Sequence, residues 1–167
     1  MIYGKGKAMK ISDKGKELIK SFEGYKTRSY HLPGELYYTV GYGHTGADVL
    51  PGYIYTRAQI DKFFDDDILK FEENVMKYND IYKWNQNEFD ALVSFAFNCG
   101  SIDYLVARGV RSREEIRGVW LAYCHDSRGE VLEGLRRRRM QELELFNTPI
   151  NTVMESSIEG GFNGTIY

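Results

Sequence analysis

Cysteine is scarce in this sequence, with only Cys99 and Cys124 among 167 residues. Two cysteines cannot form the disulfide framework of a small secreted protein, and neither lies at a spacing typical of metal ligands. We expect both to be buried free thiols, with a bridge between them as the less favoured alternative. The three histidines are scattered along the chain, so no metal site and no organic cofactor are predicted.

Long apolar runs are also absent, and no stretch is long enough to cross a bilayer as a helix. The segment MIYGKGKAMK lacks the apolar region of a signal peptide, so we expect neither export by the general secretory route nor membrane insertion. The formal net charge of −2 gives no electrostatic reason to expect a nucleic-acid partner. A chain of this length fits one domain with a sizeable core, and we expect a monomer.

Apolar residues recur at helical spacing over much of the chain, which predicts a mostly helical fold. Thr56 forms a capping box with Gln59 and precedes an apolar stripe made of Ile60, Phe64, Ile68, Phe71 and Val75. We expect a long amphipathic helix here that joins two lobes. Residues 1–10 are predicted as a flexible leader, residues 11–147 as the folded domain and residues 148–167 as an extended tail.

An early helix is predicted to deliver one carboxylate. Ser12 is a suitable N-cap, and apolar residues on one face follow it as far as Glu23, with Gly24 as a left-handed stop. The carbonyl end of a helix disfavours an ionised carboxyl, which suits a general acid. An ordinary surface glutamate fits the same position, so the position alone does not establish catalysis.

A glycine- and tyrosine-rich stretch follows this helix. Residues 27–30 and 37–42 are rich in strand-forming side chains, and the Pro33-Gly34 pair between them is a turn signal. We expect a β-hairpin with its tip at residues 32–35, and a short third strand near residues 53–55. The small sheet is predicted to form one wall of a cleft.

Three ordered blocks of sequence resemble the phage-type lysozymes of glycoside hydrolase family 24. The first contains Glu23-Gly24, Tyr30 and the run YTVGYGHT; the others are NQNEFDALVSFAFNCG and GLRRRRMQELELF. The resemblance covers roughly residues 10–147. The resemblance implies an α+β, mostly helical lysozyme-like fold, with a small β-hairpin lobe and a larger helical lobe that flank an active-site cleft.

Members of this family carry a catalytic Glu, an Asp or Cys nine residues later, and a Thr six residues beyond that. Glu23 and Thr39 match the first and last, but Leu32 stands nine residues after Glu23, and Pro33 stands six before Thr39. The usual acidic residue is therefore missing. Candidates for its water-positioning role, in order of preference, are Glu35, His31 and Asp48, although Glu35 could equally be a solvated residue of the loop tip.

The resemblance also implies further roles and a substrate. Tyr30 and Tyr42 become candidate substrate contacts, and His44 with Asp67 becomes a structural ion pair. The implied activity is that of a muramidase acting on bacterial peptidoglycan to lyse the host. Such an endolysin is made in the host cytoplasm and reaches the wall with the help of a separate holin.

Two other functions fit the same residues. A lytic transglycosylase would use Glu23 alone as acid and base, so it would not need the missing acidic residue. A non-catalytic module that binds the cell wall would retain the fold without the chemistry. Analysis of the products separates the first alternative from a hydrolase, and loss of activity in a folded Glu23→Gln variant would exclude the second.

Four consecutive arginines, residues 136–139, form the strongest basic cluster. The simplest interpretation is a solvated helix face on which Glu142 and Glu144 form weak one-turn pairs. A run of four, however, covers every side of a helix, so at least one arginine must face inward. Our hypothesis is that one of them approaches Glu23 or anionic groups of the wall.

Overall fold

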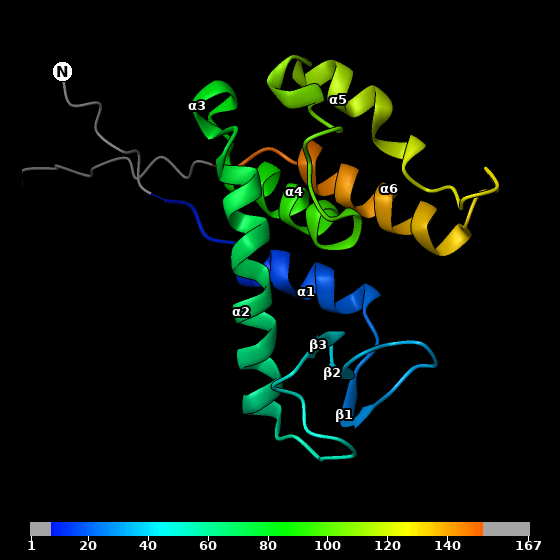
Figure 1. Cartoon of the computed structure of the whole chain (residues 1–167). Helices are drawn as coiled ribbons and strands as arrows, with labels where there is room; N and C mark the ends of the chain where they lie inside the picture. The colour runs from blue at the N-terminus through cyan, green and yellow to red at the C-terminus, as the bar shows by residue number, and fades with distance from the viewer. Residues whose placement is uncertain (1–7, 152–167) are drawn as a thin grey trace, which may run out of the picture.

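A computed structural model describes residues 8–151 of the chain (Figure 1). The helices are α1 (Asp13–Phe22), α2 (Arg57–Met76), α3 (Asn79–Tyr82), α4 (Gln86–Cys99), α5 (Arg113–Val119) and α6 (Glu133–Asn147). Three antiparallel strands, in the order β1 (Lys26–Tyr30), β2 (Tyr38–Gly41) and β3 (His44–Gly46), form the sheet. The predicted α+β, mostly helical fold is thus confirmed.

Local capping signals set the first residues of three helices. The pairs Thr56 and Gln59, Asn85 and Glu88, and Ser112 and Glu115 each form a reciprocal capping box. These contacts satisfy amide donors that the first helical turn would otherwise leave unpaired. Helix α2 therefore begins where the sequence predicted.

Helix α2 connects two parts of the molecule, with the sheet at one end and the other helices at its opposite end (Figure 1). Ile60, near its start, packs with Val40 and Tyr55 in a small core beneath the sheet. Phe64 and Ile68, further along, belong to the larger core around α4. Because one helix contributes to both cores, it joins the two lobes as expected.

The β-rich region differs in part from the prediction. The expected hairpin is present, with Tyr30 paired to Thr39, but the third strand lies at residues 44–46, where Thr45 pairs with Thr39. Near residues 53–55 there is only an isolated bridge between Arg28 and Ile54. The third strand was missed because a three-residue strand that ends in glycine has no distinct pattern.

The ends of the described chain lie against the domain. Lys10, in the predicted leader, forms an ion pair with Glu72 at 2.9 Å, and its carbonyl oxygen accepts a hydrogen bond from Gln86. The Thr148 carbonyl oxygen accepts one from Asn87. Most of the predicted leader and tail, residues 1–7 and 152–167, lies outside the described residues. Within residues 8–151, every helix is too short or too polar to span a membrane.

Candidate active site

Glu23 lies at the junction between α1 and the sheet. Its backbone is extended (φ −89°, ψ 147°), although its amide still donates to the Ile19 carbonyl oxygen. The helix therefore ends one residue earlier than predicted, and Gly24 is not a left-handed stop. This sharp change from helical to extended backbone directs the chain from α1 into β1.

The Glu23 side chain pairs with one arginine of the basic cluster. Arg138 Nη1 lies 2.6 Å from Glu23 Oε1, and the exposed fractions of the two side chains are 4% and 24%, respectively. The hypothesis that one of the four arginines approaches Glu23 is confirmed for Arg138. Glu23 Oε2 has no hydrogen-bond partner among residues 8–151, so one oxygen of this carboxyl is occupied and the other is available.

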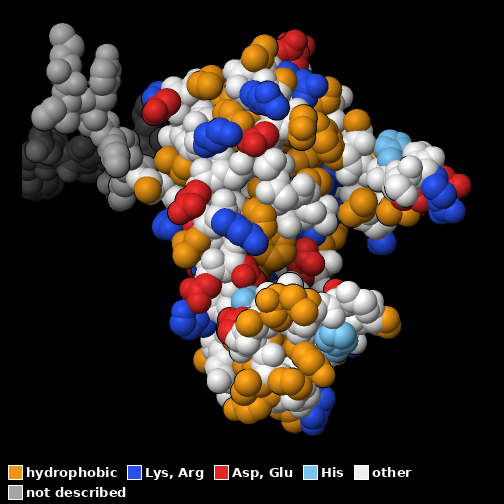
Figure 2. Space-filling view, viewed as in Figure 1, with side chains coloured by type: hydrophobic (Ala, Val, Ile, Leu, Met, Phe, Trp, Pro, Cys, Tyr) orange, Lys and Arg blue, Asp and Glu red, His pale blue; other side chains and the backbone are white. Residues whose placement is uncertain are grey.

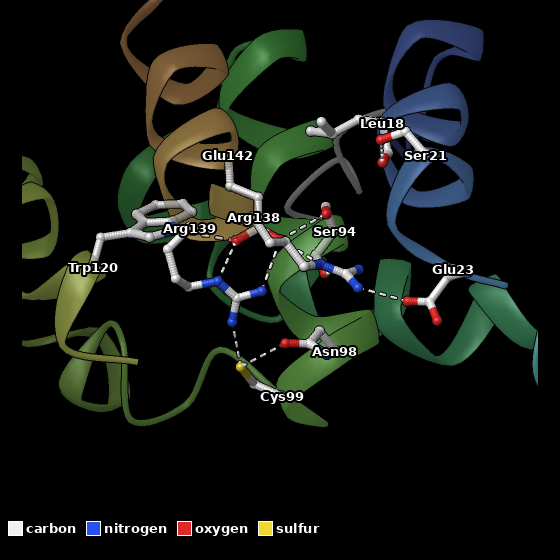
Figure 3. Close-up of polar contacts among 10 residues, drawn as sticks. All are labelled: Leu18, Ser21, Glu23, Ser94, Asn98, Cys99, Trp120, Arg138, Arg139 and Glu142. Carbon is white, nitrogen blue, oxygen red and sulfur yellow. Dashed lines mark hydrogen bonds and ion pairs between the residues drawn. The ribbon is translucent and has the colours of Figure 1, made fainter. Parts of the chain in front are cut away.

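Arg138 is itself fixed by three further residues, two of which, Glu142 and Ser94, are drawn in Figure 3. Its Nε donates to Glu142 Oε1 at 3.1 Å, and its Nη2 donates to the Ser94 carbonyl oxygen at 3.2 Å. The guanidinium also lies over the Phe22 ring, 5.5 Å from its centroid. Only Nη1 is left to meet Glu23, so the geometry of this ion pair is closely defined.

Glu142 is completely buried, which corrects the expectation of a solvated partner for the arginines. Besides Arg138, its carboxylate accepts hydrogen bonds from Ser94 Oγ (2.8 Å), Trp120 Nε1 (3.3 Å) and Arg139 Nη2 (3.0 Å). Burial raises the pKa of the Glu142 carboxyl, and the two guanidiniums act against this effect.

Two adjoining hollows meet at Glu23. One, of about 710 Å³, lies against α1 and α6 and includes Arg137 and Arg138 in its lining. The other, of about 250 Å³, lies toward the sheet and α2. Glu23 and Asn98 line both, so they occupy the middle of one continuous depression. Figure 2 shows the surface hollowed between the helical part and the sheet.

The structure brings some of the predicted site residues to this depression and leaves others outside it. Tyr42 and Asp67 line the smaller hollow together with Glu23. Thr39 is buried in β2, 6% exposed, and lines neither hollow. Neither hollow is lined by Tyr30, which is half-buried, or by three exposed residues of the β1–β2 loop, His31, Leu32 and Glu35.

His44 connects the sheet to α2. Its Nδ1 lies 2.9 Å from Asp67 Oδ2, which is the contact that was predicted. Its Nε2 lies 3.1 Å from Asp48, and its ring stacks on Phe63 with the centroids 4.1 Å apart. With both nitrogens engaged and one ring face covered, His44 is placed to hold the sheet against α2.

The two cysteines are both free. Cys124 is buried, as predicted, but Cys99 is exposed at the end of α4, and Arg139 Nη1 donates to its sulfur. The burial of Cys99 was thus wrongly predicted, because it follows the apolar face of α4 where that helix ends at the surface. Across residues 8–151, no group of three or more His, Cys, Asp or Glu side chains is arranged to hold a metal ion.

Asn98 is the site residue that sequence reasoning missed. It lies two residues before Gly100, which ends α4, and next to residues that were interpreted only as core. The available signal was a polar residue that interrupts the apolar run FAF just before the helix ends.

Comparison with known families decides the affiliation of the chain. Residues 20–142 match the family model described as phage lysozyme. The chain belongs to this family. Among curated phage lysozyme relatives, it is 41% identical over 155 residues to an endolysin of Lactococcus phage c2, and 40% identical over 154 residues to an endolysin of Bacillus phage PZA. Each alignment covers 86% of this chain, but only 63% and 58% of these relatives, respectively.

Solved structures of related proteins share the fold. The muramidase domain of SpmX from Asticaccaulis excentricus aligns with a TM-score of 0.69 at 35% identity, covering 84% of this chain and 99% of that domain. The active form of the P1 phage endolysin Lyz aligns with a TM-score of 0.65 at 27% identity, covering 81% of this chain and 84% of that protein. The phage lysozyme architecture therefore extends over most of the described residues.

Proposed function

We propose that this chain is a muramidase that hydrolyses the β-1,4 bond between N-acetylmuramic acid and N-acetylglucosamine in bacterial peptidoglycan, with Glu23 as general acid. The observation that carries the proposal is the place of Glu23, in the middle of a continuous depression. An elongated glycan strand that lies in both hollows would present a glycosidic oxygen to this carboxyl. Membership of the phage lysozyme family and the likeness to a muramidase domain support the same activity.

The two oxygens of Glu23 suit different tasks. Cleavage of a glycosidic bond requires a proton on the leaving oxygen, so Glu23 must be protonated when the substrate is bound. Oε1 accepts the hydrogen bond from Arg138, which orients the carboxyl. A proton on Oε2, the free oxygen, can be donated to the glycan without breaking that contact.

The second half of the reaction needs a water molecule on the opposite face of the sugar ring. We propose that this family member lacks the usual acidic residue, since Leu32 occupies the matching position, and that Glu35 with Thr39 positions the water instead. Glu35 lies in the exposed β1–β2 loop, where the Glu35 amide donates to the Leu32 carbonyl oxygen at 3.1 Å. Closure of this loop over the bound strand would bring the Glu35 carboxylate to the sugar.

The biological setting follows from the activity. We propose that the protein acts as a monomeric endolysin, made in the host cytoplasm and admitted to the wall by a separate holin. Tyr42, which lines the smaller hollow, would contact the glycan, as would Tyr30 once the loop has closed.

Turnover of purified peptidoglycan with mass analysis of the fragments tests the proposal. We expect fragments with reducing ends, and at least a roughly 100-fold loss of rate in Glu23→Gln. Glu17→Gln changes an exposed glutamate of the same helix and should retain full activity. A loss in Glu35→Gln with unchanged folding would support Glu35 as the residue that positions the water.

Each alternative function has its own result. Anhydro-sugar ends would show that the enzyme is a lytic transglycosylase and that hydrolysis is wrongly proposed. Binding to the wall without turnover by the wild-type protein would show a binding module.

A further inference from the structure

Behind Glu23 lies a cluster of three buried charged residues, of which the general-acid mechanism uses only one, Arg138 (Figure 3). It contains Arg138, Arg139 and Glu142, all three of which are buried. Moving ions of this kind out of water is unfavourable, and apolar side chains of similar volume often stabilise a core equally well. Stability therefore does not account for the cluster, and its connection to Glu23 suggests another role.

We propose that Glu142 is a positioning residue of this active site: it holds the Arg138 guanidinium against Glu23 and offsets the positive charge behind that carboxyl. The proposal rests on the general-acid role of Glu23 proposed above. Glu142 would not touch the substrate and would act only through Arg138.

The positional part of the argument concerns the orientation of Arg138. Glu142 Oε1 accepts a hydrogen bond from Arg138 Nε, and this contact directs Arg138 Nη1 toward Glu23. Glu142 is itself immobilised by Ser94 Oγ on α4 and by Trp120 Nε1 on the 3₁₀ helix Trp120–Ala122. The general acid is thus connected through Arg138 to a carboxylate of α6 that is held by both α4 and the 3₁₀ helix.

The electrostatic part concerns the balance of charge. Two guanidiniums lie on one side of Glu23, and an excess of positive charge favours its ionised form, which cannot donate a proton. Glu142 supplies a negative charge that compensates one of the two. The site can then keep Arg138 as an orienting group without a second uncompensated positive charge behind Glu23.

Other charged groups near Glu23 stay the same when the cluster is changed. Asp67 and Lys70 of α2 line the smaller hollow, and Arg137 of α6 lines the larger one. Asn98, on α4, is uncharged. Any change in the pH dependence after substitution within the cluster therefore reports on the cluster itself.

The test is the pH profile of kcat/KM on purified peptidoglycan for Glu142→Gln and Arg139→Gln. In Glu142→Gln, Glu23 is the only carboxylate left to balance the two guanidiniums. The alkaline limb of the profile, where kcat/KM falls as the pH rises, should therefore move to lower pH by about one unit. Arg139→Gln removes one cation, so the same limb should move to higher pH. Glu144→Gln and Arg136→Gln make the same charge changes at exposed positions of α6 and should leave the limb in place.

Opposite shifts cannot arise from lost stability, which would lower activity in both variants without moving the limb. The double variant Glu142→Gln/Arg139→Gln restores the charge balance but not the hold on Arg138. We expect its alkaline limb at the wild-type position and its kcat reduced with KM retained. This double variant carries the test if either single variant fails to fold, as judged by circular dichroism.

Several results would overturn the inference. These are a folded single variant whose alkaline limb coincides with that of the wild type, two single variants that shift in the same direction, or a double variant with wild-type kcat. All of them require an active wild-type enzyme. An inactive wild-type protein would refute the proposed function instead, so the two failures are distinguishable.

Discussion

Replacing Arg138 by lysine keeps the positive charge but removes the fork of donors. The guanidinium meets Glu23, Glu142 and the Ser94 carbonyl oxygen through three different nitrogens, at 2.6, 3.1 and 3.2 Å. An ammonium group is a single point of charge and cannot reach both carboxylates at once. We therefore expect Arg138→Lys to keep one of the two ion pairs and to break the other two hydrogen bonds.

The size of the effect follows from the hydrogen bonds that lysine cannot make. A hydrogen bond to a charged group contributes about 1.5–3 kcal/mol, and one to a neutral carbonyl about 1 kcal/mol. Removing one of each should lower the free energy of unfolding by about 3 kcal/mol. For a chain of this size, that corresponds to a Tm lower by roughly 6–12 °C.

Thermal melts followed by circular dichroism, with Arg137→Lys as the control, provide the assay. Arg137 precedes Arg138 on the same helix but is exposed, so its replacement should change Tm by less than about 2 °C. Equal melting temperatures for the two variants would refute the reasoning. Since the remaining ion pair no longer orients Glu23, kcat on peptidoglycan should also fall in Arg138→Lys.

Two further pairs of variants test the fold and its pH dependence. A Cβ at Gly15 of α1 would lie 2.7 Å from Asp90 Cγ, so Gly15→Ala should lower the free energy of unfolding by about 1–3 kcal/mol. A Cβ at Gly118 of α5 would meet nothing within 4 Å, so Gly118→Ala should raise it by about 0.5–1 kcal/mol. Urea titrations measure both changes. The hydrogen bond from Tyr78 lowers the pKa of Asp103. The ionised carboxylate therefore stabilises the fold at any pH above the ordinary pKa of an aspartate, and this contribution is lost as the pH falls through the lowered pKa. Asp103→Asn should therefore melt below the wild type at pH 7 and approach it near pH 3, and a constant difference would contradict this account. Asp80→Asn, at a fully exposed position, should show no such trend.

Local signals in the sequence were sufficient for the helices. The capping residue Thr56 predicted the start of α2, because its side chain accepts a hydrogen bond from an amide only three residues further on. Asn85 and Ser112 cap α4 and α5 in the same way. The apolar stripe of α2 predicted its length and its role between two cores for the same reason. Such features depend on neighbours in the sequence and not on the rest of the fold.

The candidate site depended on contacts that no local pattern contains. The sequence indicated that one of four arginines must face inward, but consecutive residues on a helix point about 100° apart, and only the packing of α6 against α4 selects Arg138 and Arg139. The burial of Glu142 was not predicted, because a charged side chain on a helix is usually exposed. It lies at helical spacing from Leu145 and Phe146, which are buried, and this periodicity was the available signal.

The position of Glu23 is set by both ends of α1. At the first end, the Ser12 amide donates to Asp90 Oδ1 at 2.9 Å and the absence of a side chain at Gly15 lets α1 approach α4 closely. At the other end, Glu23 pairs with Arg138, 115 residues away in the sequence. A helix of ten residues is about 15 Å long and rigid, so a displacement at its start is transmitted to its end. We therefore expect the strain in Gly15→Ala to reduce kcat even though Gly15 lies far from the glycan.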